Sequence, residues 1–149
     1  AINYGGRKMH TKRSIIISYI ACAAVGLCLI GAMFVVPGVL IKYYNSPRND
    51  ILICFYPSAV LGLTALASLI ILLKNIMENE MFCRENVRLL WIISNCCFIV
   101  AVITFIGGFF WFSFFVLSAA AGFMGLIIRV VKNVMQKGVE LREENDLTV

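Results

Sequence analysis

The chain has 149 residues and a formal net charge of +5, and 61% of its residues are hydrophobic while 14% are charged. Its mean hydropathy is +0.91. A water-soluble domain of this length needs more polar residues to cover its surface, so the composition excludes a soluble enzyme as well as a disordered or collagen-like chain. We therefore expect a small all-α integral membrane protein.

Four apolar stretches follow one another, and each is long enough to cross most or all of the roughly 30 Å hydrocarbon layer as a helix. They cover about residues 14–41, 51–73, 89–106 and 109–131. We expect a kink at Pro37 in the first, whereas Pro57 lies in the first turns of the second. Gly107 and Gly108 separate the third from the fourth, so these two form an antiparallel hairpin. The predicted architecture is an up-down bundle of four transmembrane helices.

The distribution of Lys and Arg predicts the orientation of this bundle. Eleven of the 13 basic residues lie before the first span, between the second and third, or after the fourth. The first loop on the other side has only Lys42 and Arg48. The positive-inside rule therefore places both termini in the cytoplasm of a cell whose membrane the chain crosses four times.

Three segments follow from this topology. Residues 1–13 form a cytoplasmic N-terminus, residues 14–131 the transmembrane domain, and residues 132–149 a cytoplasmic tail. Because Met9 could serve as a natural first residue, residues 1–8 can be an addition to the natural chain.

The chain lacks the residues that catalysis or metal binding would need. The single His is His10, ahead of the first span, and the six Cys show no metal-ligand spacing. No Asp, Glu, Lys, Arg or His stands between the ends of a span, which argues against a proton relay or coupled transport. We expect no enzyme activity, no metal and no cofactor.

Polar and small residues within the spans predict close helix packing. Asn95 lies seven residues beyond Arg88, and an amide at that depth should find an interhelical partner. Small residues recur at about four-residue spacing on three spans: Ser18, Cys22 and Gly26; Ser58 and Gly62; Ser118, Ala121, Gly122 and Gly125. Such faces let helices approach closely, with packing inside one chain as the default and packing between two chains as the alternative.

Aromatic residues gather at the outer ends of the spans. Tyr43 and Tyr44 lie near the first loop, and Trp111 and Phe112 lie in the hairpin. Interfacial anchoring is the ordinary role of such residues. The alternative is a rim that binds a hydrophobic peptide or a lipid arriving from outside.

The cytoplasmic side carries the most distinctive sequence. The inner loop contains FCRENVRLL at residues 82–90, where Glu85 and Asn86 could cap the third helix. The tail ends in GVELREENDLTV at residues 138–149, and we expect its helix to stop near Asn145. These two motifs resemble those of a bacterial membrane protein family known as domain of unknown function 2975. The resemblance covers nearly the whole chain from Met9.

The resemblance implies four spans, no enzyme activity and a cytoplasmic partner, since members of that family are often encoded beside a small helix-turn-helix regulator. A basic partner would be attracted to an acidic tail. The residues we expect to contact it are Phe82, Glu85, Asn86, Glu143, Glu144, Asn145, Asp146 and Leu147.

Three functional hypotheses remain open. The first is a regulator or sensor that binds this partner at the cytoplasmic face. The second is an immunity or resistance protein that intercepts a membrane-active peptide or lipid-like ligand at Tyr43, Tyr44, Trp111 and Phe112. The third, a small carrier or channel formed by dimerisation, is disfavoured because the spans enclose little polar volume. We expect no direct binding of nucleic acid, since the basic residues follow the inner-leaflet rule, and the oligomeric state stays open.

Overall fold

The computed structural model describes residues 4–45, 49–78 and 82–148, with side chains from residue 11 onward in the first of these ranges. The described chain is all-α and contains four helices: α1 (Tyr4–Tyr44), α2 (Asn49–Met77), α3 (Arg84–Gly107) and α4 (Ser113–Leu147). Each is long and apolar enough to cross a membrane. The prediction of an all-helical protein with four candidate transmembrane helices is thus confirmed. Arg48 and residues 1–3 of the N-terminal segment lie outside the described residues.

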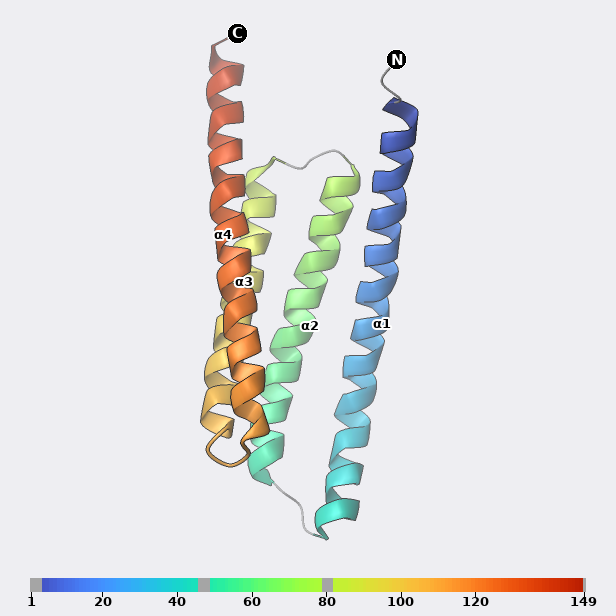
Figure 1. Ribbon diagram of the computed structural model, residues 1–149, viewed down its shortest axis with the longest axis vertical. Helices are drawn as coiled ribbons and strands as arrows, with labels where there is room; N and C mark the ends of the chain where they lie inside the picture. The colour runs from blue at the N-terminus through green and yellow to red at the C-terminus, as the bar shows by residue number, and fades with distance from the viewer. Residues whose placement is uncertain (1–3, 46–48, 79–81, 149) are drawn as a thin grey trace.

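The four helices run up and down in chain order, as Figure 1 shows, so that α1 packs on α2, α2 on α3 and α3 on α4. The start of α1, the end of α2, the start of α3 and the end of α4 lie at one end of the molecule, which we call the terminal end. The turn between α3 and α4 lies at the opposite end, the hairpin end. The up-down topology matches the expected one. In the order of packing, α1 is the first helix and α4 is the last.

The helices are longer than the apolar stretches that predict them. α1 stays helical through Pro37, the position of the expected kink. α2 begins at Asn49, so Pro57 lies in its third turn. α4 begins at Ser113 rather than near residue 109, and it continues as one helix through most of the expected tail. The helix expected in the tail is therefore the continuation of α4, and it ends at Leu147, two residues beyond Asn145.

Small residues let α3 and α4 approach each other closely. A Cβ atom added at Gly125 would lie 3.3 Å from Cys97 Cβ, so a larger residue at this position would push the helices apart. The hydroxyl of Ser94 donates to the carbonyl of Gly125 at 3.0 Å, and that of Ser118 donates to the carbonyl of Ala101 at 2.7 Å. The small-residue face of the fourth span therefore packs within the chain, against α3.

A compact apolar cluster holds the terminal end together. Leu72 of α2 and the neighbours Leu89 and Leu90 of α3 are buried at its centre. Ile128 and Met135 of α4 pack against them from the other side. This cluster fixes α2 and α4 relative to the start of α3, which is where the candidate site lies.

The candidate loop–tail site

A hydrogen bond between two amides, one buried and one half-buried, fixes the start of α3 against the end of α2. The side-chain nitrogen of Asn75 donates to the amide oxygen of Asn86 at 2.8 Å, and Asn86 is 0% exposed. The residue at the N-cap of α3 is Cys83, which makes no side-chain capping hydrogen bond. Glu85 and Asn86, which were expected to cap α3, therefore lie inside its first turn, and the oxygen of the Asn86 amide bonds to α2. For the same reason Asn86 serves the packing of α2 on α3 and not a docking surface.

An ion pair joins the start of α3 to the end of α4. The guanidinium of Arg84 donates two hydrogen bonds to the carboxylate of Glu143, both at 2.8 Å. This bidentate geometry is the most specific that an arginine and a carboxylate can form. The hydrogen bond from Arg84 lowers the pKa of Glu143 below its ordinary value, and the hydrogen bond and charge of Glu143 raise the pKa of Arg84. Both side chains are exposed, so the ion pair adds little to the free energy of unfolding. It links the first turn of α3 to the last turns of α4.

An aromatic contact and a backbone contact reinforce this ion pair. The ring of Phe82 lies against Gly138, where an added Cβ would come within 2.7 Å of the ring. Arg142 donates to the carbonyl oxygen of Phe82 at 3.4 Å. Glycine at position 138 thus leaves the space that lets the ring rest on α4. Three contacts together clamp the loop before α3 onto the last turns of α4.

The sequence-predicted partner residues fall into two groups. Glu143 is occupied by Arg84, and Asn86 is buried. The other predicted residues are exposed on the same end of the molecule: Phe82, Glu85, Glu144, Asn145, Asp146 and Leu147. We call these six residues, together with the Arg84–Glu143 pair, the loop–tail surface. Sequence reasoning missed Arg84, Gly138 and Arg142, whose roles depend on contacts across about 60 positions of the chain.

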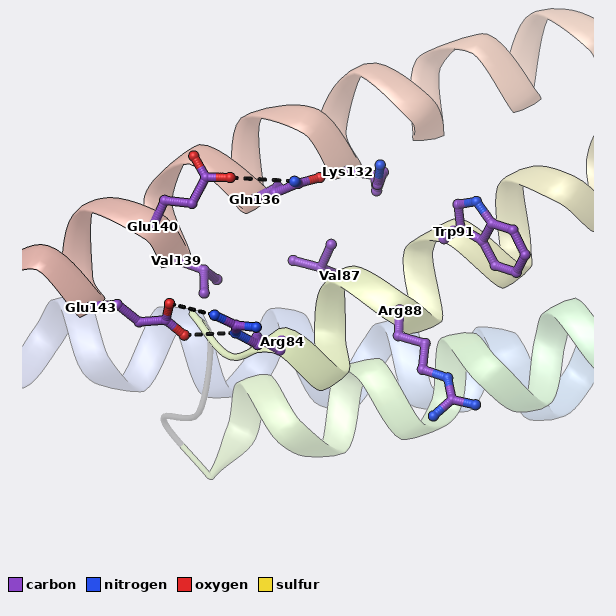
Figure 2. Close-up of a pocket in the computed structure, with 9 residues that line it drawn as sticks. All are labelled: Arg84, Val87, Arg88, Trp91, Lys132, Gln136, Val139, Glu140 and Glu143. Atoms are coloured by element: carbon purple, nitrogen blue, oxygen red, sulfur yellow. Dashed lines mark hydrogen bonds and ion pairs between the residues drawn. The ribbon is translucent and has the colours of Figure 1, made fainter.

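A groove runs between α3 and α4 beside this surface, with a volume of about 380 Å³. We call it the α3–α4 groove; it is lined by Arg84, Val87, Arg88, Trp91, Lys132, Gln136, Val139, Glu140 and Glu143. Figure 2 shows the Arg84–Glu143 pair at one end, with Lys132 and Trp91 toward the other. Its walls are therefore apolar in the middle and charged at the rim.

Asn95, expected to bond to another helix, accepts a hydrogen bond from Arg129 of α4 at 2.9 Å. The guanidinium of Arg129 also lies 5.2 Å from the centre of the Phe98 ring. The sequence had placed Arg129 among the charges that follow the fourth span. In the structure it lies alongside Asn95, two turns past Arg88 in the direction of the hairpin, and the amide and the ring accommodate its charge there.

A second hollow lies at the hairpin end, with a volume of about 290 Å³. It is lined by Leu40, Tyr44, Ile51, Trp111, Ser113, Phe114 and Leu117, and we call it the hairpin pocket. The rings of Tyr44 and Trp111 meet edge to face with centroids 5.8 Å apart. Tyr43 and Phe112, which were expected to act with them, are 81% and 80% exposed and do not line the pocket.

In the part of the chain that the structure describes, no group of three or more His, Cys, Asp or Glu side chains is placed to hold a metal ion. No disulfide joins the cysteines of the described ranges.

Comparison with known proteins gives one match. A family model described as "Protein of unknown function (DUF2975)" matches residues 13–149. No curated protein and no solved structure matches the chain. The matched range contains all of α2, α3 and α4 and most of α1.

Proposed function

The chain belongs to the DUF2975 family of proteins of unknown function, and from this premise we propose that it is a non-enzymatic regulator or sensor of the bacterial inner membrane. In this proposal both termini are cytoplasmic, and the loop–tail surface binds a basic cytoplasmic partner such as a small helix-turn-helix regulator. The four apolar helices support a multi-pass membrane protein.

The single observation that carries the proposal is the clamp between the loop and the tail. Two segments with distinctive sequence, about 60 positions apart, are joined by the Arg84–Glu143 pair and by the packing of Phe82 on Gly138. An exposed tail without a binding role would not need such a fixed position. Because α4 is continuous from the membrane to Leu147, movement of a span would be transmitted directly to this surface.

The charge that remains at the surface suits a basic partner. Glu143 is neutralised by Arg84, whereas Glu85, Glu144 and Asp146 are exposed and form no ion pair within the described residues. Leu147 adds an exposed apolar side chain beside them. Carboxylates around an apolar contact increase the rate of encounter with a cationic protein and orient it.

Binding of a purified regulator to the full chain in lipid nanodiscs tests this proposal. Replacement of Glu144→Gln together with Asp146→Asn should weaken binding by roughly threefold to tenfold, because exposed ion pairs contribute modestly. The same change of charge made at Asp50→Asn and Glu78→Gln, away from the tail, is the matched control. Equal affinity of the tail variant and the control would contradict the proposal.

A second candidate function rests on the hairpin pocket. We propose as the alternative that a membrane-active peptide or lipid-like ligand is intercepted there, as an immunity or resistance protein would do. The edge-to-face contact of Tyr44 with Trp111 at the rim supports this alternative. Trp111→Ala should then abolish protection of cells without lowering expression, whereas Phe112→Ala, outside the pocket, should have little effect.

A further inference from the structure

The α3–α4 groove contains two kinds of charge. Its carboxylates are already neutralised: Glu143 binds Arg84, and Glu140 accepts from Gln136 at 3.3 Å and lies 3.5 Å from Lys137. Its remaining cations, Arg88 and Lys132, form no ion pair among residues 4–45, 49–78 and 82–148. The groove therefore keeps an uncompensated positive charge.

These two cations lie at the same level of the molecule. Ser94 of α3 faces Gly125 of α4, and the helices are antiparallel. Arg88 lies six residues before Ser94 on α3, and Lys132 lies seven residues after Gly125 on α4. Figure 2 shows Lys132 on α4 and Arg88 on α3, with the flexible Arg88 side chain directed away from α4. Both side chains line the same groove.

The level at which they lie is the boundary of the apolar span. The uncharged part of α3 begins at Leu89, directly after Arg88. Trp91, three residues after Arg88, lines the groove and is 50% exposed. Tryptophan prefers the layer where headgroups meet hydrocarbon, and its indole N–H can donate to a headgroup oxygen. The groove thus opens where the phosphates of a bilayer lie.

We propose that the α3–α4 groove is a binding site for the headgroup of an anionic glycerophospholipid. The phosphate lies between Arg88 and Lys132, Trp91 donates from its indole nitrogen, and an acyl chain follows the apolar surface of α3 and α4 toward the hairpin end. Basic pockets between transmembrane helices recognise anionic headgroups in this way. The volume of about 380 Å³ accommodates a headgroup.

This inference goes beyond the proposed function and does not depend on it, since the loop–tail surface and the lipid site use different unpaired charges. The two sites share the Arg84–Glu143 pair, which forms the wall between them. An occupied groove would support α4 at the point where it leaves the membrane.

Native mass spectrometry of the full chain, titrated with phosphatidylglycerol or phosphatidylcholine, tests the proposal. We expect one phosphatidylglycerol to be retained in preference to phosphatidylcholine. The double variant Arg88→Gln/Lys132→Gln should bind it about 30-fold more weakly, since two cations contribute about 1 kcal/mol each and 1.4 kcal/mol corresponds to tenfold. The matched control Lys12→Gln/Lys74→Gln removes two exposed charges from the same end and should bind as the unaltered chain does.

Fluorescence gives an independent readout. The chain has two tryptophans, so in a Trp111→Phe variant the emission comes from Trp91 alone. Phosphatidylglycerol with brominated chains should quench it more than brominated phosphatidylcholine at the same mole fraction. Equal quenching by both lipids, or equal lipid affinity in the groove variant and its control, overturns the proposal. Displacement of phosphatidylglycerol by millimolar inorganic phosphate would also overturn it, because the site would then bind a free anion.

Discussion

The hydrogen bond between Asn75 of α2 and the buried Asn86 of α3 provides a quantitative test of how the site is held. Asn86→Ala removes the oxygen that accepts from Asn75 and empties part of a fully buried position. The half-buried Asn75 amide then loses its acceptor, and a donor shielded from water that is left without its partner costs about 1–3 kcal/mol. The small cavity adds about 1 kcal/mol. We therefore expect Asn86→Ala to lower the free energy of unfolding by about 2–4 kcal/mol.

Unfolding by SDS in mixed micelles, followed by circular dichroism, measures this loss. Asn133→Ala removes an exposed amide from α4 and serves as the control, which should change stability by less than about 0.5 kcal/mol. Asn75→Ala completes a double-mutant cycle. Since the two amides bond directly, the double variant should lose less stability than the sum of the single variants, by about 0.5–3 kcal/mol.

Strict additivity of the two substitutions would refute this reasoning, because it would mean that Asn75 and Asn86 do not interact in the folded protein. A loss below about 1 kcal/mol for Asn86→Ala would refute the claim that the position is buried and bonded.

Three further predictions concern α4. Glu143→Arg should raise amide hydrogen exchange in residues 139–147, and the swap Arg84→Glu/Glu143→Arg should restore protection; no recovery would contradict the ion pair. Because Arg84 lowers the pKa of Glu143, the pair contributes fully above the ordinary glutamate pKa and is lost as the pH falls through the lowered value. The difference in exchange between the unaltered chain and Glu143→Gln should therefore persist at neutral pH and vanish in acid, and a difference that does not change with pH would argue against it. Gly125→Leu should destabilise the chain by about 2–4 kcal/mol through overpacking and loss of the Ser94 bond. Gly31→Leu, with open space around it, should not, and equal Tm values for these two variants would contradict the described α3–α4 packing.

Local composition was enough to predict the elements of the fold. Long uncharged stretches predict membrane helices because each backbone polar group must be satisfied inside its own helix in hydrocarbon. The spacing of Ser118, Gly122 and Gly125, by four and then three residues, likewise predicted a close contact, and the structure shows α3 as its partner. These features depend on neighbours in the chain, so the sequence displays them directly.

The contacts that form the site depend on residues far apart. Nothing in the pattern around Asn95 identifies Arg129 as its donor, 34 positions away. The Arg84–Glu143 pair joins residues 59 positions apart, and several other acids in the tail were equal candidates for Arg84. Glu85 and Asn86 were expected to cap the third helix because Asn is favoured at helix starts, but α3 begins at Arg84, and the buried Asn86 amide bonds to Asn75, 11 positions away on α2. Tertiary packing, not local propensity, decided each of these cases.

The proposal that the loop–tail surface binds a basic partner is tested most directly by photo-cross-linking in cells. A photoreactive residue is placed in turn at Phe82, Leu147 and, as a control at the hairpin end, Phe112. We predict that one and the same basic cytoplasmic protein is captured from Phe82 and Leu147, not from Phe112, and that Glu144→Gln/Asp146→Asn removes it. Different proteins captured at Phe82 and Leu147, or capture that survives the loss of both charges, would contradict the account.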